Sequence, residues 1–423
     1  MAKTIKPFDT SKKPTKVWPI LLPVEWIGTA FLTLGYKVNK INCENLEAPY
    51  LVLCNHSAFV DFPMAVKGMF PHKSSWVISV EEFVGREWLM RAIGGIYKRK
   101  FTSDLKVVKH ILYALTRQKV CCTIYPEARF SLIGINEQID GALGKLAKTA
   151  KCPVVTFIQH GNFLQSPQWN KHPYRKVPIV GEFKQIVTKE EVMTLSADEI
   201  QARIEAEFHY DDYAWQKENN IKIKSKKRAH NLHKVLYQCP VCGKEFCTDS
   251  KDTRIWCNEC GASWEMNELG ELIRENGENV FTHVPDWYNW ERENVRREVC
   301  EGRYKFEDEA RLEIMANAVV GFKKLGNVKL THDYNGFTME GVLDDGTEFK
   351  FNRSVASMRS LHIEYDFKKK GVTTPSDGID LATDKETYFA YPNTAHNVLT
   401  KLHFATEELH LAEFESKKQK IEA

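Results

Sequence analysis

Short apolar runs alternate with amphipathic stretches from about residue 50 to residue 160, and this alternation constrains the fold more than any other feature. The runs have the length of buried strands. Between the third and fourth, the segment 104–118 repeats leucine and valine at helical spacing, and Ser103 can cap it. Strands that alternate with helices are typical of an α/β domain with a sheet flanked by helices. The expected strands are Leu51–Cys54, Trp76–Val80, Gly95–Lys98, Val120–Tyr125 and Val154–Gln159.

A histidine and an aspartate lie five positions apart directly after the first expected strand, in the segment Asn55–Asp61 (NHSAFVD). A histidine acts as a general base near neutral pH when one ring nitrogen is free to take a proton. A carboxylate on the other nitrogen fixes that tautomer and stabilises the imidazolium. His56 and Asp61 are therefore a candidate catalytic pair. The alternative is a structural histidine, which is the more common role of a histidine taken in isolation.

Four ordered blocks of the chain resemble the glycerolipid acyltransferase family, which includes the 1-acylglycerol-3-phosphate acyltransferases. The blocks are Asn55–Asp61, Gly94–Lys100 (GGIYKRK), Tyr125–Ser131 (YPEARFS) and Pro153–Thr156 (PVVT). The resemblance implies transfer of a fatty acyl group from acyl-CoA or acyl carrier protein to the hydroxyl of a lysophospholipid, with 1-acylglycerol-3-phosphate as the first expectation. It also implies that His56 is the general base and that Asp61 orients it, in an α/β acyltransferase domain with a mixed sheet.

The second and third blocks depart from the family's pattern. In the third, alanine stands where the family has the glycine of Pro-Glu-Gly-Thr-Arg, and Arg129 lies one place nearer to Glu127. In the second, Arg99 and Lys100 stand where the family has Asp and Arg. By the resemblance, Glu127 binds or orients the acceptor, while Arg99, Lys100 and Arg129 hold its anionic head group. Alternatively, the three basic residues are solvated surface charges, and Glu127 is a salt-bridged or capping carboxylate. The altered third block also leaves open a different acceptor, such as a lyso-aminolipid.

Two Cys-x-x-Cys pairs indicate a metal site in the second half of the chain. Cys239 and Cys242 are separated from Cys257 and Cys260 by 14 residues, and a glycine follows each pair. Four thiolates at such spacing suit tetrahedral zinc, and glycine lets the backbone turn around the ion. We expect a structural zinc ribbon, because no coordination position is left open for catalysis. Cys247 is a further possible ligand that lies out of register, and a redox dithiol is the weaker alternative.

The segment Trp18–Tyr36 is apolar and about long enough to span a bilayer, but it contains Pro19, Pro23 and Glu25. Upstream lysines and flanking aromatic residues suit a helix that lies in the membrane interface. A buried helical hairpin is the equal alternative. We expect a cytoplasmic protein that is peripheral on the inner face of the plasma membrane, since the eleven cysteines show no disulfide framework.

The remainder of the chain reads as a basic linker and a β-rich domain. Segment 219–238 is rich in lysine, which suits either attraction to anionic lipids or a solubilising linker. The net charge of +3 is nearly balanced, so any anionic partner depends on such local patches, and we expect no nucleic-acid partner. Aromatic-rich runs separated by turn signals, followed by a terminal helix, suggest a small domain with a possible pleckstrin-homology or GRAM-like architecture. A non-catalytic lipid- or nucleic-acid-binding scaffold remains the alternative from another functional class. The expected parts are a helical segment at 1–36, the acyltransferase domain at 37–217, the linker at 218–238, the zinc ribbon at 239–272, and a helix with the β-rich domain at 285–423.

Overall fold

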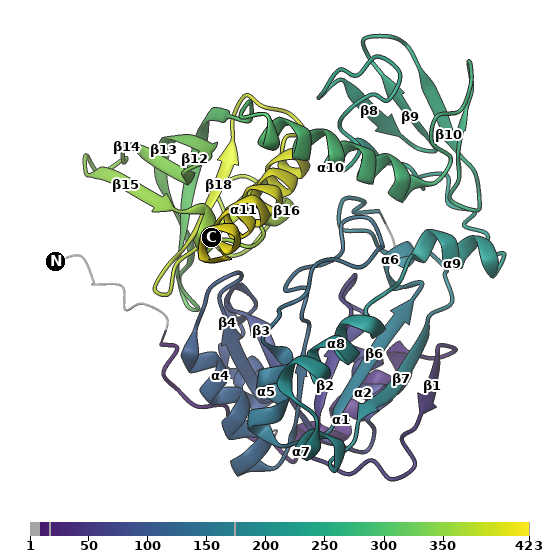
Figure 1. Cartoon of the computed structure of the whole chain (residues 1–423), viewed down its shortest axis with the longest axis vertical. Helices are drawn as coiled ribbons and strands as arrows, with labels where there is room; N and C mark the ends of the chain where they lie inside the picture. The colour runs from purple at the N-terminus through teal and green to yellow at the C-terminus, as the bar shows by residue number, and fades with distance from the viewer. Residues whose placement is uncertain (1–8, 17, 173–174, 423) are drawn as a thin grey trace. The chain divides into compact units, whose positions relative to one another are not determined.

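The computed structural model describes residues 9–16, 18–172 and 175–422, and these residues form two compact units (Figure 1). The N-terminal unit holds Asp9–Lys98 and Asp104–Ser225. The C-terminal unit holds Lys226–Ala423 together with the short segment Arg99–Ser103. The boundary after Ser225 falls inside the segment expected as a basic linker at 218–238.

A mixed seven-stranded sheet forms the centre of the N-terminal unit, in the order β1-β7-β6-β2-β5-β3-β4. Neighbouring strands are parallel, except for the antiparallel pair of β6 and β7. The strands are β1 (Lys37–Ile41), β2 (Leu51–Cys54), β3 (Ser74–Ser79), β4 (Gly95–Lys98), β5 (Cys121–Ile124), β6 (Val154–His160) and β7 (Val180–Val187).

Helices pack on both faces of this sheet because its central strands are apolar on both sides (Figure 1). Along β2, Leu51 and Leu53 join the core beneath α4, α5 and α8, while Val52 and Cys54 join the core beneath α2. The helices are α1 (Leu21–Leu32), α2 (Asp61–Met69), α3 (Glu87–Ala92), α4 (Leu105–Leu112), α5 (Leu143–Ala150), α6 (Asn162–Gln165), α7 (Glu191–Thr194), α8 (Ala197–Glu207) and α9 (Asp212–Glu218).

All five strands expected between residues 50 and 160 are present, and the mixed α/β class is confirmed. The expected helix at 104–118 begins one residue later than predicted, because Asp104 rather than Ser103 caps it by accepting a hydrogen bond from the backbone of Lys106 at 2.8 Å. Its last turn, Tyr113–Gln118, is a π-helix. Both predicted capping boxes form, at Thr188 with Glu191 and at Ser196 with Glu199.

The segment expected to span or lie along a membrane contains the single helix α1. Residues 1–8 and 17 of this region lie outside the described residues. Among the residues that the structure describes, no helix is both long and apolar enough to cross a bilayer. Helix α1 packs against α2, where Lys67 donates hydrogen bonds to the carbonyls of Thr33 and Tyr36. Most of its apolar side chains nevertheless stay exposed.

The C-terminal unit contains a small four-stranded sheet and a larger seven-stranded one, which confirms the β-rich prediction. Every strand pair in both sheets is antiparallel. The larger sheet runs β15-β14-β13-β12-β18-β17-β16, and α11 packs on β16 and β17. Its elements are β8 (Thr248–Lys251), β9 (Arg254–Cys257), β10 (Ser263–Met266), β11 (Leu272–Arg274), α10 (Val284–Cys300), β12 (Phe306–Asn317), β13 (Gly321–Asp333), β14 (Gly336–Val342), β15 (Glu348–Arg353), β16 (His362–Phe367), β17 (Ser376–Ala382), β18 (Thr387–Pro392) and α11 (Leu399–Glu422).

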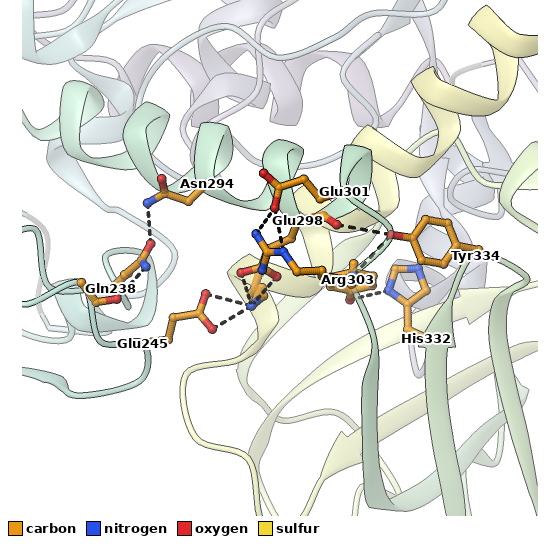
Figure 2. A network of polar contacts seen from close by, with 11 residues as sticks. Gln238, Glu245, Asn294, Glu298, Glu301, Arg303, His332 and Tyr334 are labelled. Atoms are coloured by element: carbon orange, nitrogen blue, oxygen red, sulfur yellow. Dashed lines mark hydrogen bonds and ion pairs between the residues drawn. The ribbon is translucent and has the colours of Figure 1, made fainter.

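A polar network on α10 joins the two sheets of this unit (Figure 2). Asn294 of α10 donates to the side chain of Gln238 at 2.7 Å, beside the cysteine-rich segment. One turn further, Glu298 shares Lys401 of α11 with Glu245. Tyr334 at the end of β13 donates to the backbone carbonyl of Val299 at 2.9 Å. The C-terminal half of α10 therefore links the cysteine-rich segment with α11 and with the end of β13.

Candidate functional site

The C-terminal ends of three adjacent strands bring the candidate residues of the N-terminal unit together. His56 follows β2, Glu127 follows β5, and Asn162 follows β6, with β2 in the middle of the three. Ligands of open α/β sheets gather at this edge. The side chain of Asn55 ties β2 to β6 by bonding both the N–H and the C=O of Gln159, at 2.9 and 2.8 Å.

His56 and Asp61 form the pair that their spacing predicted. The Nδ1 of His56 lies 2.9 Å from the Oδ2 of Asp61. Because a carboxylate oxygen accepts, Nδ1 donates, and the other ring nitrogen, Nε2, carries the lone pair. The imidazole is 22% exposed while Asp61 is fully buried, so the free nitrogen is the part that a substrate can reach.

Asp61 is surrounded by hydrogen-bond donors. Its Oδ2 also accepts from the backbone N–H groups of Ser57 and Ala58, at 2.6 and 2.9 Å, where the chain turns into α2. Its Oδ1 accepts from the Nδ2 of Asn162 at 2.8 Å. Donors at both oxygens fix the rotation of the Asp61 carboxylate. The orientation of the His56 imidazole is therefore set by a carboxylate that cannot rotate freely.

Glu127 is buried next to the histidine, with its carboxylate turned toward the protein. It accepts hydrogen bonds from the hydroxyl of Tyr210 at 2.8 Å and from the backbone N–H groups of Glu137 and His56, at 3.1 and 3.3 Å. Burial raises the pKa of Glu127 to about 8, against the opposing effect of these hydrogen bonds. The geometry places Glu127 as a support for the His56 turn. Its predicted role in acceptor binding remains a prediction.

Arg129, the predicted head-group ligand of the third block, is an internal side chain. It forms an ion pair with Glu137 at 2.7 Å, and the side chains are 3% and 5% exposed. The preceding Ala128 has a φ of +59°, a left-handed conformation that favours glycine. A glycine would adopt this conformation at position 128 without strain, whereas Ala128 adopts it at some energetic cost.

Arg99 and Lys100, the predicted head-group ligands of the second block, belong to the segment grouped with the C-terminal unit. Arg99 donates to the carbonyl oxygens of Asp384 and Lys385, at 3.2 and 2.6 Å. Lys100 contacts Asp380 at 3.0 Å and Glu364 at 3.3 Å. Both side chains are engaged within the C-terminal unit, and their predicted role in acceptor binding remains a prediction.

Part of the N-terminal unit matches a known protein family. Residues 37–159 match the family model described as Acyltransferase, and all four sequence blocks lie within the match. The chain carries an acyltransferase domain. The predicted resemblance to the glycerolipid acyltransferases is thereby confirmed at the level of the family, and so is the prediction of an acyl-transferring enzyme.

One solved structure also shows similarity to part of the chain. This is the 1-acyl-sn-glycerophosphate (LPA) acyltransferase PlsC from Thermotoga maritima, with 16% sequence identity and a TM-score of 0.35. The similarity covers 44% of this chain and 76% of that chain. No curated protein matches the chain significantly.

Outside the acyltransferase domain, the four predicted cysteine ligands converge. Cys239, Cys242, Cys257 and Cys260 each offer a sulfur, and these sulfurs lie within 4.8 Å of one another. The glycines after the two pairs, Gly243 and Gly261, both have a φ of +72°, as a backbone that turns back around an ion requires.

Sequence reasoning missed several residues of the acyltransferase site. Asn162 and Tyr210 bond the two buried carboxylates, and Tyr125 and Phe130 pack on the imidazole. Asn162 could have been noticed, because it follows a predicted strand whose neighbour in the sheet carries His56. Tyr210 has no such signal, since it lies 83 residues from Glu127 in a loop between two helices.

Proposed function

We propose that this chain transfers a fatty acyl group from acyl-CoA or acyl carrier protein to the hydroxyl of a lipid acceptor of the lysophospholipid type. The observation that carries the proposal is the chain of hydrogen bonds from Asn162 through Asp61 to His56, on an acyltransferase domain. It leaves one imidazole nitrogen with a lone pair on the partly exposed side of the ring.

The proposed reaction uses His56 as a general base. Its Nε2 takes the proton of the acceptor hydroxyl while that oxygen attacks the thioester carbonyl. The bond from the carbonyl carbon to sulfur then breaks, and the leaving thiolate takes the proton back from the imidazolium. Asp61 stabilises the imidazolium between these two steps and keeps its basic nitrogen directed toward the acceptor. No acyl-enzyme is required, since a thiolate is already a good leaving group.

The acceptor implied by the resemblance is 1-acylglycerol-3-phosphate, and a lyso-aminolipid is the second candidate. One observation favours the second. Arg129 is paired with Glu137 in the interior, and a phosphate would have to compete with a buried carboxylate for it. The first candidate requires that this pair open when the acceptor binds.

An acceptor panel tests the proposed function. Purified protein is incubated with radiolabelled acyl-CoA or acyl carrier protein and with lipids that each carry one free hydroxyl. We expect label in the acceptor with wild-type protein and at most one hundredth of that rate with His56→Ala, since general-base assistance is worth about 100- to 10,000-fold. Labelled product at equal rates with both proteins would contradict the proposal and would leave the binding scaffold as the alternative.

We further propose that the cysteine cluster holds one structural zinc ion. Sulfurs about 2.3 Å from a tetrahedral centre lie about 3.8 Å apart. The distance between the sulfurs of Cys239 and Cys260 is 3.7 Å, and that between Cys242 and Cys257 is 3.8 Å, so the donor set fits the ion. The sulfur of Cys247 lies 3.4 Å from that of Cys257 and donates toward the carbonyl of Lys244, which favours a place outside the ligand set.

The proposed location is the inner face of the plasma membrane, with α1 as the attachment. Apolar side chains along and beside α1 are exposed, among them Ile27 at 69% and Phe31 at 82%. An exposed apolar face of this kind suits burial in the headgroup region of a bilayer. The upstream lysines would add attraction to anionic lipids.

A further inference from the structure

The imidazole of His56 lies between two aromatic rings. The ring of Tyr125 is stacked on it, with centroids 4.0 Å apart and planes at 24°. The ring of Phe130 lies 4.1 Å away with planes at 35°. Two rings this close and this nearly parallel to the imidazole cannot occupy the same face, so they cover opposite faces. An acceptor therefore approaches His56 along the edge of its ring, between two aromatic side chains.

The arginine that lies nearest to this edge in sequence already has an acidic partner. Arg129 directly precedes Phe130, yet it is paired with the buried carboxylate of Glu137. To bind a phosphate, it would have to leave Glu137 as a buried unpaired charge. In the described part of the chain, no lysine or arginine forms a hydrogen bond, ion pair or ring contact with His56, Tyr125 or Phe130.

The basic residues of the second block are held elsewhere. Lys100 lies between Asp380 and Glu364, and its charge helps to lower the pKa of Asp380 against the opposing effect of burial. Arg99 is bonded to two backbone carbonyls of the same unit. Both side chains are therefore engaged by partners within the C-terminal unit.

An exposed apolar side chain also follows the histidine closely in the sequence. Phe59 is 64% exposed and lies three positions after His56, just before α2. The faces of Tyr125 and Phe130 carry the negative side of the aromatic quadrupole, which stabilises an imidazolium but repels an anion. A phosphate monoester beside these rings would lose hydration, and Arg129, the arginine nearest in sequence, is already paired with Glu137.

We propose that the acceptor carries its reacting hydroxyl on an uncharged part of the lipid, with no phosphate monoester on the neighbouring carbon. Phe130 is then a residue that determines specificity, because it fills one face of the base with an apolar ring. The inference rests on the proposed function and replaces its first acceptor with lipid alcohols that are neutral around the hydroxyl. A lyso-aminolipid or a monoacylglycerol meets this condition, whereas 1-acylglycerol-3-phosphate does not.

The test uses two acceptors that differ only in the phosphate, 1-oleoylglycerol and 1-oleoylglycerol-3-phosphate, in the same neutral detergent micelles. Both are offered to wild-type protein with oleoyl-CoA and with oleoyl acyl carrier protein. We expect kcat/KM to be at least about 10-fold higher for 1-oleoylglycerol. Because this comparison uses only the wild-type chain, it does not depend on the folding of a variant.

Two variants of Phe130 distinguish the effect of the side chain's charge on acceptor preference from the effect of its shape. Phe130→Arg, which places a cation beside the base, should lower the ratio of the two kcat/KM values by at least about 10-fold. Phe130→Leu keeps the site apolar and should leave the ratio within about 3-fold of wild type while kcat falls. Circular dichroism checks that both variants fold.

The outcomes distinguish the inference from the proposed function. Faster transfer to 1-oleoylglycerol-3-phosphate by the wild-type protein would overturn the inference and leave the acyltransferase assignment of His56 standing. Transfer with either donor to neither of these acceptors, nor to a lyso-aminolipid offered in the same micelles, would overturn both. An unchanged ratio in a folded Phe130→Arg protein would remove Phe130 as the residue that determines specificity.

Discussion

The amide nitrogen of Asn162 donates a 2.8 Å hydrogen bond to the carboxylate oxygen of Asp61 that does not contact His56. Asn162 opens the four-residue helix α6 at the end of β6, and it is fully buried. The other oxygen of Asp61 accepts from the histidine and from two backbone N–H groups. Asn162 is therefore a positioning residue that acts on the base through the aspartate.

Replacing Asn162 tests this role. Asn162→Ala leaves one oxygen of Asp61 buried without a donor, and a hydrogen bond to a charged group is worth about 1.5 to 3 kcal/mol. We expect kcat to fall by about 10-fold or more, with KM changed by less than about 3-fold. The measurement is steady-state kinetics, together with a thermal melt.

Gln165 provides the matched control, because it is a buried amide at the other end of the same helix. It donates to the hydroxyl of Tyr36 and does not contact Asp61. Gln165→Ala should lower stability to a similar extent while kcat stays within about 2-fold of wild type. Equal losses of kcat in the two variants would show that the helix, and not the bond to Asp61, affects the rate.

The buried Glu127 predicts a pH dependence of stability. Burial raises the pKa of Glu127 from 4.5 to about 8, so between these values the folded chain holds a proton that the unfolded chain releases. The free energy of unfolding contributed by this group therefore falls as pH rises through that interval, by at most about 1.4 kcal/mol per pH unit. Glu127→Gln should flatten the slope, whereas Glu190→Gln at an exposed site should not. Chemical denaturation at several pH values measures it, and identical slopes in all three proteins would contradict the prediction.

The cysteine cluster predicts one zinc ion per chain. Elemental analysis of protein purified without chelators should give a ratio near one, and Cys242→Ser should lose the metal. Cys247→Ala and the exposed Cys300→Ala should retain it. Because structural zinc contributes directly to folding, removing it with a chelator should unfold β8–β11. Retention of zinc by Cys242→Ser would show that the four sulfurs are not the ligands.

Helix α1 predicts membrane binding that depends on its exposed face. Ile27→Glu and Phe31→Glu should reduce co-sedimentation with vesicles that contain phosphatidylglycerol, while Leu105→Glu, at a residue of α4 that is 76% exposed, should not. Burial raises the pKa of Glu25 in α1 to about 7, so binding should be stronger below that pH than above it. Glu25→Gln should remove this difference. Equal binding by all variants would exclude α1 as the attachment.

The fold of the N-terminal unit could be predicted well from sequence, because its central strands supply apolar side chains to the cores on both faces of the sheet. Residues of β2 alternate between the two faces of the sheet, and each face is apolar, so strand positions follow from short apolar runs. The pairing of His56 with Asp61 also followed from local spacing, since the turn into α2 sets it. The cysteine ligands were predictable for the same reason.

Contacts made across loops and between distant parts of the chain could not be predicted. The ion pair of Arg129 with Glu137, eight positions further along a loop, was not anticipated, and the predicted contact of Arg129 with the acceptor stays a prediction. Lys100 is engaged by Asp380, which is 280 residues away. Local sequence shows which charges are present and does not show which partners neutralise them. The long strands β12 and β13 were also not recognised, because runs of adjacent charged residues interrupt the alternation of apolar and polar residues in both.

The central claim is that His56 is the general base and that Asp61 acts through it. Kinetics of wild type, His56→Ala, Asp61→Asn and the double variant test this most directly. We expect each single variant to lose at least about 100-fold in kcat, and the double variant to lose little more than the worse single one, because residues that act as a unit are not additive. Circular dichroism confirms that each variant folds. Wild-type turnover by a folded His56→Ala protein, or losses that multiply in the double variant, would contradict the account.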